Sequence, residues 1–237
     1  MRVTAILLAA GKGARLRLRL PKPLVKINSK PIIIYSLRAL DRHPDIKDII
    51  VVVNLENSQG IISQIKQYNI NKVCHVIRGG LRRQDSVYNG LKVLNPDTDL
   101  VLIHDVARPF IDKRIVSSVI KEGKISSAAI LGVPVKATIK KLKAQSSKLK
   151  GKLIVEETLN RNNLWEIQTP QVFKKDLILK AYEKFGGTDV TDDASLVEKI
   201  GVKVSVVLGS YNNIKITTPE DLILAKAIAK VIKSGAK

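Results

Sequence analysis

The stretch Ile6-Leu7-Leu8-Ala9-Ala10-Gly11-Lys12-Gly13-Ala14-Arg15 decides the fold of this chain of 237 residues. An apolar run breaks into a turn with two glycines, and glycine tolerates both a positive φ and the close approach of an anion. We therefore expect backbone N–H groups at Gly11 and Gly13 to line an anion site. Arg15 and Lys22 supply positive charge beside it. A strand followed by such a turn is typical of α/β proteins that bind phosphates.

The spacing of this turn excludes two common nucleotide motifs. A dinucleotide fingerprint would need a third glycine where Leu16 stands, and a Walker A loop would end in Gly-Lys-Ser/Thr. An ordinary β-to-α turn with surface lysines therefore stays open as an alternative.

Short apolar runs alternate with helical patterns along the whole chain. Runs of Val, Ile and Leu are typical of buried parallel strands, and they predict strands at residues 4–8, 49–53, 73–77, 100–103, 128–133 and 202–207. Apolar residues spaced three and four apart predict helices at 31–40, 59–68, 84–94, 113–122, 174–185, 192–200 and 219–232. The alternation predicts an α/β fold with a doubly wound, mostly parallel sheet of the Rossmann-like type, with ligands at the carboxyl ends of its strands.

Residues 134–157 break this alternation, because they are polar and rich in lysine between two strand-like ends. The pattern predicts a β-hairpin arm that projects from a single domain spanning residues 1–237. An arm of this kind buries little surface by itself. We therefore expect it to pack on a second copy of the chain in a homodimer, with a solvated excursion as the alternative.

The charge of the chain is strongly positive, with 41 Lys+Arg against 21 Asp+Glu and a net charge of +20. Such a charge attracts polyanions, so a nucleic-acid-binding module is one alternative. The lysines are dispersed, however, and aromatic residues make up only 4% of the chain, too few for an evident base-stacking platform. The composition therefore favours an anion-binding enzyme with a generally basic surface, and we expect no specific nucleic acid as partner.

Segments for export or membrane anchoring are not evident in the sequence. No apolar run reaches the roughly 18 residues of a membrane span, and residues 3–10 are too short for a secretory signal. We expect no membrane partner and a cytoplasmic location. The single cysteine, Cys74, excludes an internal disulfide and is expected to be buried in a strand.

Further polar residues follow two other predicted strands. A second glycine turn spans residues 79–87, where backbone groups and Ser86 can approach a base or ribose. His104-Asp105-Val106-Ala107-Arg108-Pro109 ends the next strand. Asp105 is a candidate contact for Mg²⁺ or a hydroxyl, because a metal bound through phosphates needs few protein ligands. A local ion pair between Asp105 and Arg108 is the alternative, and His104 is expected to serve packing or hydrogen bonding.

Motifs in one order over about 210 residues carry a family resemblance. They are Ala9-Ala10-Gly11-x-Gly13-x-Arg15, Pro21-Lys22, Asp85-Ser86-Val87, His104-Asp105-x-Ala107-Arg108-Pro109, Asn160-Arg161-Asn162, Leu164-Trp165, Thr169-Pro170-Gln171, Thr191-Asp192-Asp193-Ala194-Ser195, Asn213-Ile214-Lys215-Ile216-Thr217 and Pro219-Glu220-Asp221. The chain resembles the 2-C-methyl-D-erythritol 4-phosphate cytidylyltransferase family. These enzymes join CTP and methylerythritol phosphate into a CDP-alcohol and release pyrophosphate.

The resemblance implies roles for individual residues. Arg15 and Lys22 stabilise the charge that develops on the α-phosphate, whereas Arg161 and Lys215 position the incoming phosphate. Contacts to CTP are implied at Ala9, Ala10, Gly11, Gly13, Gly80, Arg83 and Ser86, and contacts to the methylerythritol group at Asp105, Thr138, Arg161, Thr169, Thr191 and Lys215. It also implies Mg²⁺, held mainly by the CTP phosphates, and a dimer in which the arm reaches across, so that Thr138 and Arg161 serve the partner's site.

Two departures from the family concern the nucleotide. Pro23 stands where the family usually has glutamine, and Leu81 stands where it often has a polar residue. The stretch Pro-Lys-Pro-Leu is similar to sugar-phosphate nucleotidyltransferases, which share the first turn, but the motifs at 191–195 and 213–217 do not fit them. Ribitol 5-phosphate cytidylyltransferase, a sister enzyme with the same chemistry, remains the closest alternative.

Overall fold

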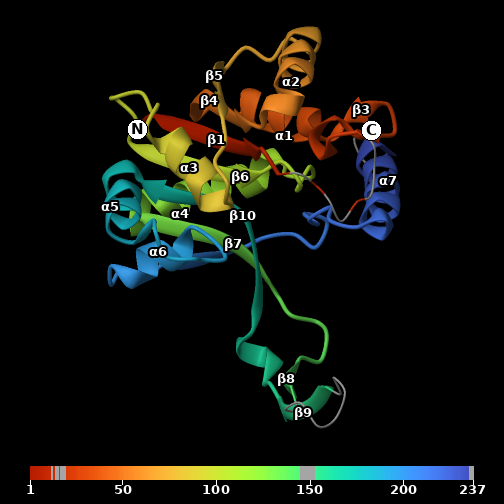
Figure 1. Cartoon of the computed structure of the whole chain (residues 1–237), viewed down its shortest axis with the longest axis vertical. Helices are drawn as coiled ribbons and strands as arrows, with labels where there is room; N and C mark the ends of the chain where they lie inside the picture. The colour runs from red at the N-terminus through yellow and green to blue at the C-terminus, as the bar shows by residue number, and fades with distance from the viewer. Residues whose placement is uncertain (12, 14–15, 17–19, 145–152, 235–237) are drawn as a thin grey trace.

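The computed structural model describes the chain apart from residues 12, 14–15, 17–19, 145–152 and 235–237. Its centre is a seven-stranded sheet with the order β11-β7-β10-β6-β1-β4-β5 (Figure 1). These strands are β1 Val3–Ala9, β4 Ile46–Val53, β5 Val73–Arg78, β6 Leu100–Asp105, β7 Ala128–Pro134, β10 Trp165–Lys174 and β11 Ser205–Leu208. The α-helices are α1 Ile32–Asp41, α2 Leu55–Gln67, α3 Arg83–Leu91, α4 Lys113–Ser126, α5 Lys175–Phe185, α6 Ala194–Lys199 and α7 Pro219–Ser234.

Strand β1 lies inside the sheet and organises the core on both of its faces. It pairs in parallel with β4 and β6, and all of its residues are buried. Successive side chains of a strand point to opposite faces. Ala5 and Leu7 therefore pack in one apolar cluster with residues of α1, α4 and α7, and Ile6 and Leu8 pack in another with residues of α3, α5 and α6. The predicted doubly wound α/β fold is confirmed.

One strand of the sheet was missed by the sequence analysis. Strand β10 runs antiparallel to both of its neighbours, β6 and β7, whereas the other neighbouring pairs of the sheet are parallel. Its pairing with β7 shifts register between Gln168 and Gln171, across Thr169 and Pro170. Proline cannot donate to a strand ladder and interrupts the strand pattern in a sequence, which explains the omission. The sheet is therefore mostly parallel, as expected.

Several predicted boundaries were wrong. Helix α2 begins at Leu55 and not at 59, because the Asn54 side chain accepts a hydrogen bond from Asn57 N at 2.9 Å and caps the helix. Helix α4 extends to Ser126, where Ser127 leaves the helix with φ 71°. Helix α3 ends at Leu91, and strand β11 begins at Ser205 and not at 202.

The prediction for Cys74 was half right. The residue lies in strand β5 as expected, but it is exposed. Strand β5 is at the edge of the sheet, and its burial pattern contains no fully buried residue. An edge strand next to a single neighbour leaves part of its surface uncovered, so an apolar run there does not guarantee burial.

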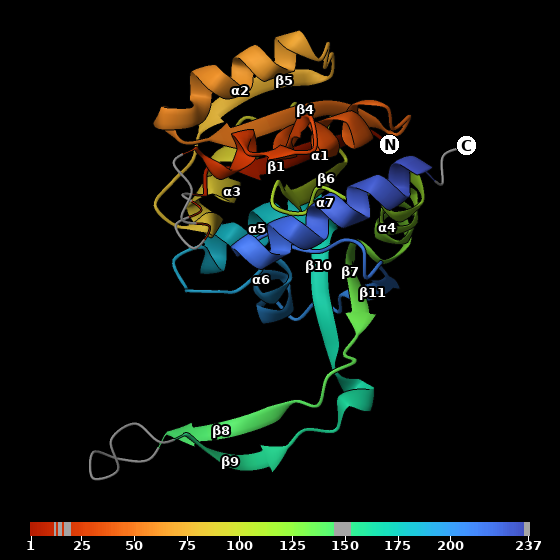
Figure 2. The same cartoon turned by 90° about the vertical axis from the view of Figure 1, so that its right-hand side faces the viewer.

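The predicted arm is a two-stranded sheet separate from the main one. Strands β8 Lys140–Ala144 and β9 Leu153–Thr158 pair antiparallel. The arm projects well away from the body of the protein (Figure 2). The β-hairpin is thus confirmed, with β9 ending one residue beyond the predicted boundary, while residues 145–152 lie outside the described part. Two short strands, β2 Lys26–Ile27 and β3 Lys30–Pro31, and two 3₁₀ helices, η2 Lys22–Leu24 and η3 Arg161–Asn163, complete the described elements.

Within the described residues, no helix is long and apolar enough to cross a membrane.

Candidate active site

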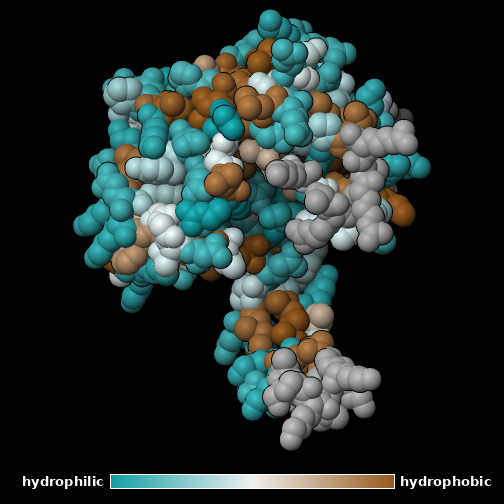
Figure 3. All heavy atoms as spheres, viewed as in Figure 1, coloured by the Kyte–Doolittle hydropathy of each residue, from teal (hydrophilic) through white to brown (hydrophobic). Residues whose placement is uncertain are grey.

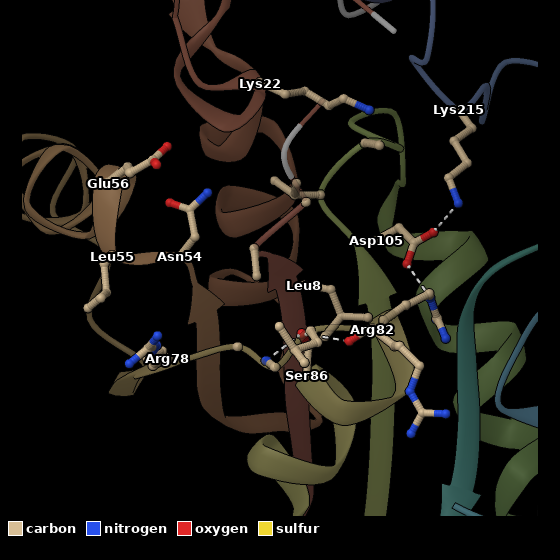
Figure 4. Close-up of a pocket in the computed structure, with 18 residues that line it drawn as sticks. Leu8, Lys22, Asn54, Leu55, Glu56, Arg78, Arg82, Ser86, Asp105 and Lys215 are labelled. Atoms are coloured by element: carbon tan, nitrogen blue, oxygen red, sulfur yellow. Dashed lines mark hydrogen bonds and ion pairs between the residues drawn. The ribbon is translucent and has the colours of Figure 1, made fainter. Parts of the chain in front are cut away.

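A first cavity of about 640 Å³ opens at the carboxyl ends of β1, β4, β5 and β6. The residues at or just after the ends of these strands, Ala10, Asn54, Gly79 and Asp105, all line it. Other predicted site residues that line it are Gly11, Lys22, Gly80, Arg83, Ser86 and Lys215 (Figure 4). Parallel strands bring their carboxyl ends to one edge, which is why residues far apart in the sequence meet here.

The first glycine turn differs in part from the expectation. Gly13 has φ 63°, as expected, but Gly11 is not among the described glycines with positive φ. A Cβ atom at Gly11 would meet nothing within 4 Å, so the backbone there borders open space. Ala9 does not line the cavity, because it is buried and its carbonyl accepts a hydrogen bond from Asn57 Nδ2 at 3.1 Å. Arg15 lies outside the described residues.

The second glycine turn packs tightly against the start of α3. Ser86 Oγ accepts a hydrogen bond from Gly80 N at 3.1 Å, which holds the turn on the helix (Figure 4). A Cβ atom at Gly79 would lie 2.6 Å from Ala10 Cβ, and one at Gly80 would collide with Asp85. Glycine is therefore required for the close approach of the two turns. Leu81 follows them at the wall of the cavity and is fully exposed.

A second cavity of about 440 Å³ adjoins the first. Four of the predicted acceptor-binding residues line it: Asp105, Thr169, Thr191 and Lys215. Arg83, Asp105 and Lys215 line both cavities and form what we call the junction cluster. The remaining polar residues that line the second cavity are Arg108, Gln168, Gln171, Asp192, Ser195 and Glu198.

The junction cluster is a carboxylate held between two cations. Asp105 Oδ1 accepts a hydrogen bond from Arg83 Nε at 3.1 Å, and Asp105 Oδ2 accepts one from Lys215 Nζ at 2.7 Å (Figure 4). Burial alone would raise the pKa of Asp105, but Arg83 and Lys215 outweigh it and hold that pKa below its usual range. The alternative of a local ion pair with Arg108 is wrong, since Arg108 donates instead to the carbonyls of Asn213 and Ile167.

His104 supports the second cavity from behind. It is fully buried, its Nε2 lies 2.9 Å from the Arg108 carbonyl, and its Nδ1 lies 3.0 Å from Thr169 Oγ1. A carbonyl only accepts, so the proton is assigned to Nε2 and Nδ1 accepts from the threonine. Thr169 Oγ1 in turn accepts from Asp105 N at 3.1 Å. Burial lowers the pKa of His104 to about 4, so the expected role in packing and hydrogen bonding is supported by its surroundings.

Two lysines from opposite ends of the chain approach the junction. Lys22 Nζ donates a hydrogen bond to the carbonyl of Ile216 at 2.9 Å, next to Lys215 in the chain. Ile216 N donates to the Ala107 carbonyl at 2.8 Å, which fixes this segment against the loop after β6. The first cavity therefore has cations on the side that borders the second.

Comparison with known proteins agrees with this architecture. Residues 3–231 match the family described as IspD: 2-C-methyl-D-erythritol 4-phosphate cytidylyltransferase. The chain belongs to this family. The expected family and the expected class of enzyme, a nucleotidyltransferase, are thereby confirmed, and the function predicted from the sequence is that of the family.

Individual members of the IspD family are similar over nearly their whole length. A 2-C-methyl-D-erythritol 4-phosphate cytidylyltransferase from Caldanaerobacter subterraneus is 43% identical over 229 residues, covering 95% of this chain and 98% of the relative. The crystal structure of 4-diphosphocytidyl-2C-methyl-D-erythritol synthase from Anaerococcus prevotii has a TM-score of 0.82 and 33% identity, covering 96% of each chain. The Thermus thermophilus enzyme of the same family has a TM-score of 0.76 and 28% identity, covering 97% of this chain and 100% of that one.

Besides Ala9 and Gly13, two predicted site residues of this family member lie outside both cavities. Thr138 and Arg161 are exposed on the segments that enter and leave the arm. Arg161 Nη1 donates to the Lys136 carbonyl at 2.8 Å. The structure does not bring these two residues to the site of their own chain.

The described residues of this family member offer few side chains that could bind a metal. They contain no group of three or more His, Cys, Asp or Glu side chains that could hold a metal ion. The carboxylates of the first cavity are Glu56 and Asp105, and both oxygens of Asp105 accept hydrogen bonds from cations. A cation bound through phosphate oxygens needs only one or two protein carboxylates. Asp105 lies at the junction, and it would offer an oxygen to such a cation only in exchange for its hydrogen bond to Arg83 or Lys215.

Sequence reasoning missed several residues that line the two cavities. Asn54, Glu56 and Arg78 line the first, and Arg108 lines the second. A usable signal was present, because Asn54 directly follows β4 and Arg78 ends β5. A survey of the residue after every predicted parallel strand would have found both.

Proposed function

We propose that this chain transfers the cytidylyl group of CTP to 2-C-methyl-D-erythritol 4-phosphate and releases pyrophosphate, in the non-mevalonate isoprenoid precursor pathway. The observation that carries the proposal is the pair of adjoining cavities that share Arg83, Asp105 and Lys215. A reaction that joins two anions needs two neighbouring sites with cations where they meet. Membership of the IspD family names the two substrates.

The first cavity is proposed to bind CTP. Its two glycine turns and Ser86 offer backbone and hydroxyl groups to the base and ribose, and the exposed Leu81 and Leu55 offer apolar surface. Lys22 lies on the side toward the junction, where the triphosphate belongs, and Arg15 is proposed to join it. The cavity thus offers apolar and hydrogen-bonding groups to a base and cations to phosphates, as a nucleotide needs.

The second cavity is proposed to bind the alcohol phosphate. An oxygen of the acceptor phosphate attacks the α-phosphorus of CTP, and the bond to pyrophosphate breaks. Lys22 stabilises the charge that develops on the α-phosphate, while Lys215 holds the attacking phosphate in line. A phosphate is already ionised near neutral pH, so no general base is required. The buried, fully bonded His104 is consistent with that requirement.

Mg²⁺ is proposed as the cofactor, held by the triphosphate and by Asp105. When bound, it offsets phosphate charge and aids the departure of pyrophosphate. The residues of the chain then have to keep the two phosphates aligned, which the junction cluster between the two cavities is suited to do. A cytoplasmic location stays a prediction from the sequence.

The arm is proposed to complete the site of a second copy of the chain. Apolar side chains lie exposed on it, where a solvated hairpin would gain nothing from them (Figure 3): Leu142, Leu153, Ile154 and Val155. A matching surface on a second copy would bury them and give a two-fold symmetric dimer. Thr138 and Arg161 would then reach the partner's second cavity.

Mixing two impaired variants tests this arrangement, in an assay with the alcohol phosphate far below its KM for R161A, where each variant alone turns over little. In a mixed dimer of K22A and R161A, one site has both substitutions and the other has neither if Arg161 acts across the interface. Activity then returns to about a quarter of the wild-type value after subunit exchange. If Arg161 acts in its own chain, every site has one substitution and no activity returns.

The proposed reaction itself is tested by pyrophosphate release from CTP with Mg²⁺. Methylerythritol 4-phosphate and ribitol 5-phosphate are compared at equal concentration. Strong preference for methylerythritol phosphate is expected. Preference for ribitol phosphate would keep the chemistry and change the acceptor, whereas no release with either would contradict the proposal.

A further inference from the structure

Asp193 is a carboxylate buried directly behind the second cavity. It has an exposed fraction of 0% and immediately precedes α6. The neighbouring residue Asp192 caps the start of that helix, because Asp192 Oδ1 accepts a hydrogen bond from Ser195 N at 3.1 Å. The Asp193 side chain makes no capping hydrogen bond. Helix capping therefore does not account for a second buried charge at this position.

The contacts of Asp193 lead to the junction cluster. Its Oδ1 accepts a hydrogen bond from Tyr182 OH at 2.6 Å, and its Oδ2 pairs with Arg83 Nη2 at 2.8 Å. The same guanidinium uses its Nε for Asp105. Asp105 thus holds the Arg83 guanidinium by a hydrogen bond to Nε, whereas Asp193 Oδ2, which is buried and makes no hydrogen bond, holds the same group at Nη2 as an ion pair.

The charges alternate along this row of side chains. Asp193, Arg83, Asp105 and Lys215 follow one another, each paired with the next. Burial alone would lower the pKa of Arg83, but Asp193 and Asp105 outweigh it and raise that pKa above its usual value. Without the Asp193 charge, Asp105 would be the only carboxylate paired with Arg83. Arg83 would then draw Asp105 more strongly away from Lys215.

We propose that Asp193 is a positioning residue for the acceptor phosphate, which acts through Arg83 to fix Asp105 and Lys215 at the junction. The proposal rests on the proposed transfer reaction. Arg83 lines both cavities and is an implied CTP contact, so a smaller effect on CTP is expected as well. The larger effect falls on the acceptor side, because Thr191 and Asp192 line the second cavity just before Asp193 in the chain. Gly79 and Gly80 of the second glycine turn are held by other contacts.

The test is the substitution Asp193→Asn, which keeps the size of the side chain and an oxygen for Tyr182 but removes the charge. We expect the KM for the alcohol phosphate to rise about tenfold or more, with the KM for CTP changed less than about threefold. Calorimetric titration of the alcohol phosphate should show the same loss of affinity. Equal KM values for D193N and wild type, with only a lower unfolding midpoint, would overturn the proposal, as would a larger effect on CTP.

Two further variants make the result specific. The substitution Asp48→Asn breaks a two-bond pair with Arg2 of 2.8 and 3.0 Å, far along β1 and β4 from the cavities, and should change neither KM. The substitution Arg83→Lys keeps the charge but cannot reach both carboxylates with one fork. It should reproduce the acceptor defect, and combining it with D193N should add less than the product of the single effects.

Failure of this inference is distinguishable from failure of the proposed function. Wild-type turnover with CTP and the alcohol phosphate decides the function. If D193N does not fold, R83K alone carries the test: an acceptor-specific rise in KM supports the proposal, and unchanged KM values overturn it.

Discussion

Lowering the pH from 7.5 to 5 should destabilise the fold through His104. Burial lowers the pKa of this side chain to about 4, against about 6.5 in an unfolded chain. Between these values the unfolded chain binds a proton that the folded chain does not, so stability falls as the pH falls. At pH 5 the difference amounts to about 2 kcal/mol, and it approaches about 3 kcal/mol below pH 4. Protonation would also remove Nδ1 as acceptor for the Thr169 hydroxyl.

Urea denaturation of wild type and H104Q at both pH values measures this effect. Wild type should lose about 2 kcal/mol more than H104Q between pH 7.5 and 5. Burial also lowers the pKa of His43, so H43Q is the matched control: it removes a different buried histidine and leaves the contribution of His104 to the pH dependence in place. The lowered pKa of Asp105 contributes stability that is lost only as the pH falls below about 4, outside this window. Equal losses in wild type and H104Q would refute the reasoning.

Three substitutions test the site directly. Lys22→Ala should lower kcat about a hundredfold, because it removes a cation from the transition state, while thermal denaturation shows an intact fold; an unchanged kcat would refute its role. Arg161→Ala should raise the KM for the alcohol phosphate more than that for CTP in steady-state assays, and the reverse pattern would place it on the nucleotide side. Leu81→Ala should raise the KM for CTP about fivefold with kcat unchanged. The Leu81 side chain is fully exposed without ligand, and the substitution removes its apolar contact with the bound nucleotide. An unchanged KM would show that the nucleotide does not cover this side chain.

The fold was predictable where local pattern and burial agree. Strand β1 is a continuous apolar run, and its side chains face two cores, so the pattern led directly to a sheet with helices on both faces. Strand β10 was not predicted, because Pro170 interrupts its strand-like sequence pattern. The exposure of Cys74 could not be foreseen, since the position of β5 at the edge follows from the strand order and not from its composition.

The site was predictable in its parts but not in its pairing. Asp105 was found because it ends a strand, yet its partners are 22 and 110 residues away, at Arg83 and Lys215. The nearer Arg108 is drawn to two carbonyls instead. Spacing along the sequence cannot predict which cation pairs with Asp105, because the pairing depends on how α3 and the segment before α7 approach the end of β6. The buried partner of Arg83, Asp193, was hidden inside a motif for the same reason.

The antiparallel strand explains how the arm can be inserted without disturbing the sheet. Two antiparallel neighbours can be joined by a hairpin, whereas parallel neighbours need a crossover. Strand β7 runs outward and β10 returns, with Trp165 paired to Pro134 where the main sheet ends, so the arm continues a path that the sheet already provides. The returning strand then carries Thr169 to Asp105 N and His104. One strand thus connects the base of the arm with the second cavity, where the acceptor is proposed to bind.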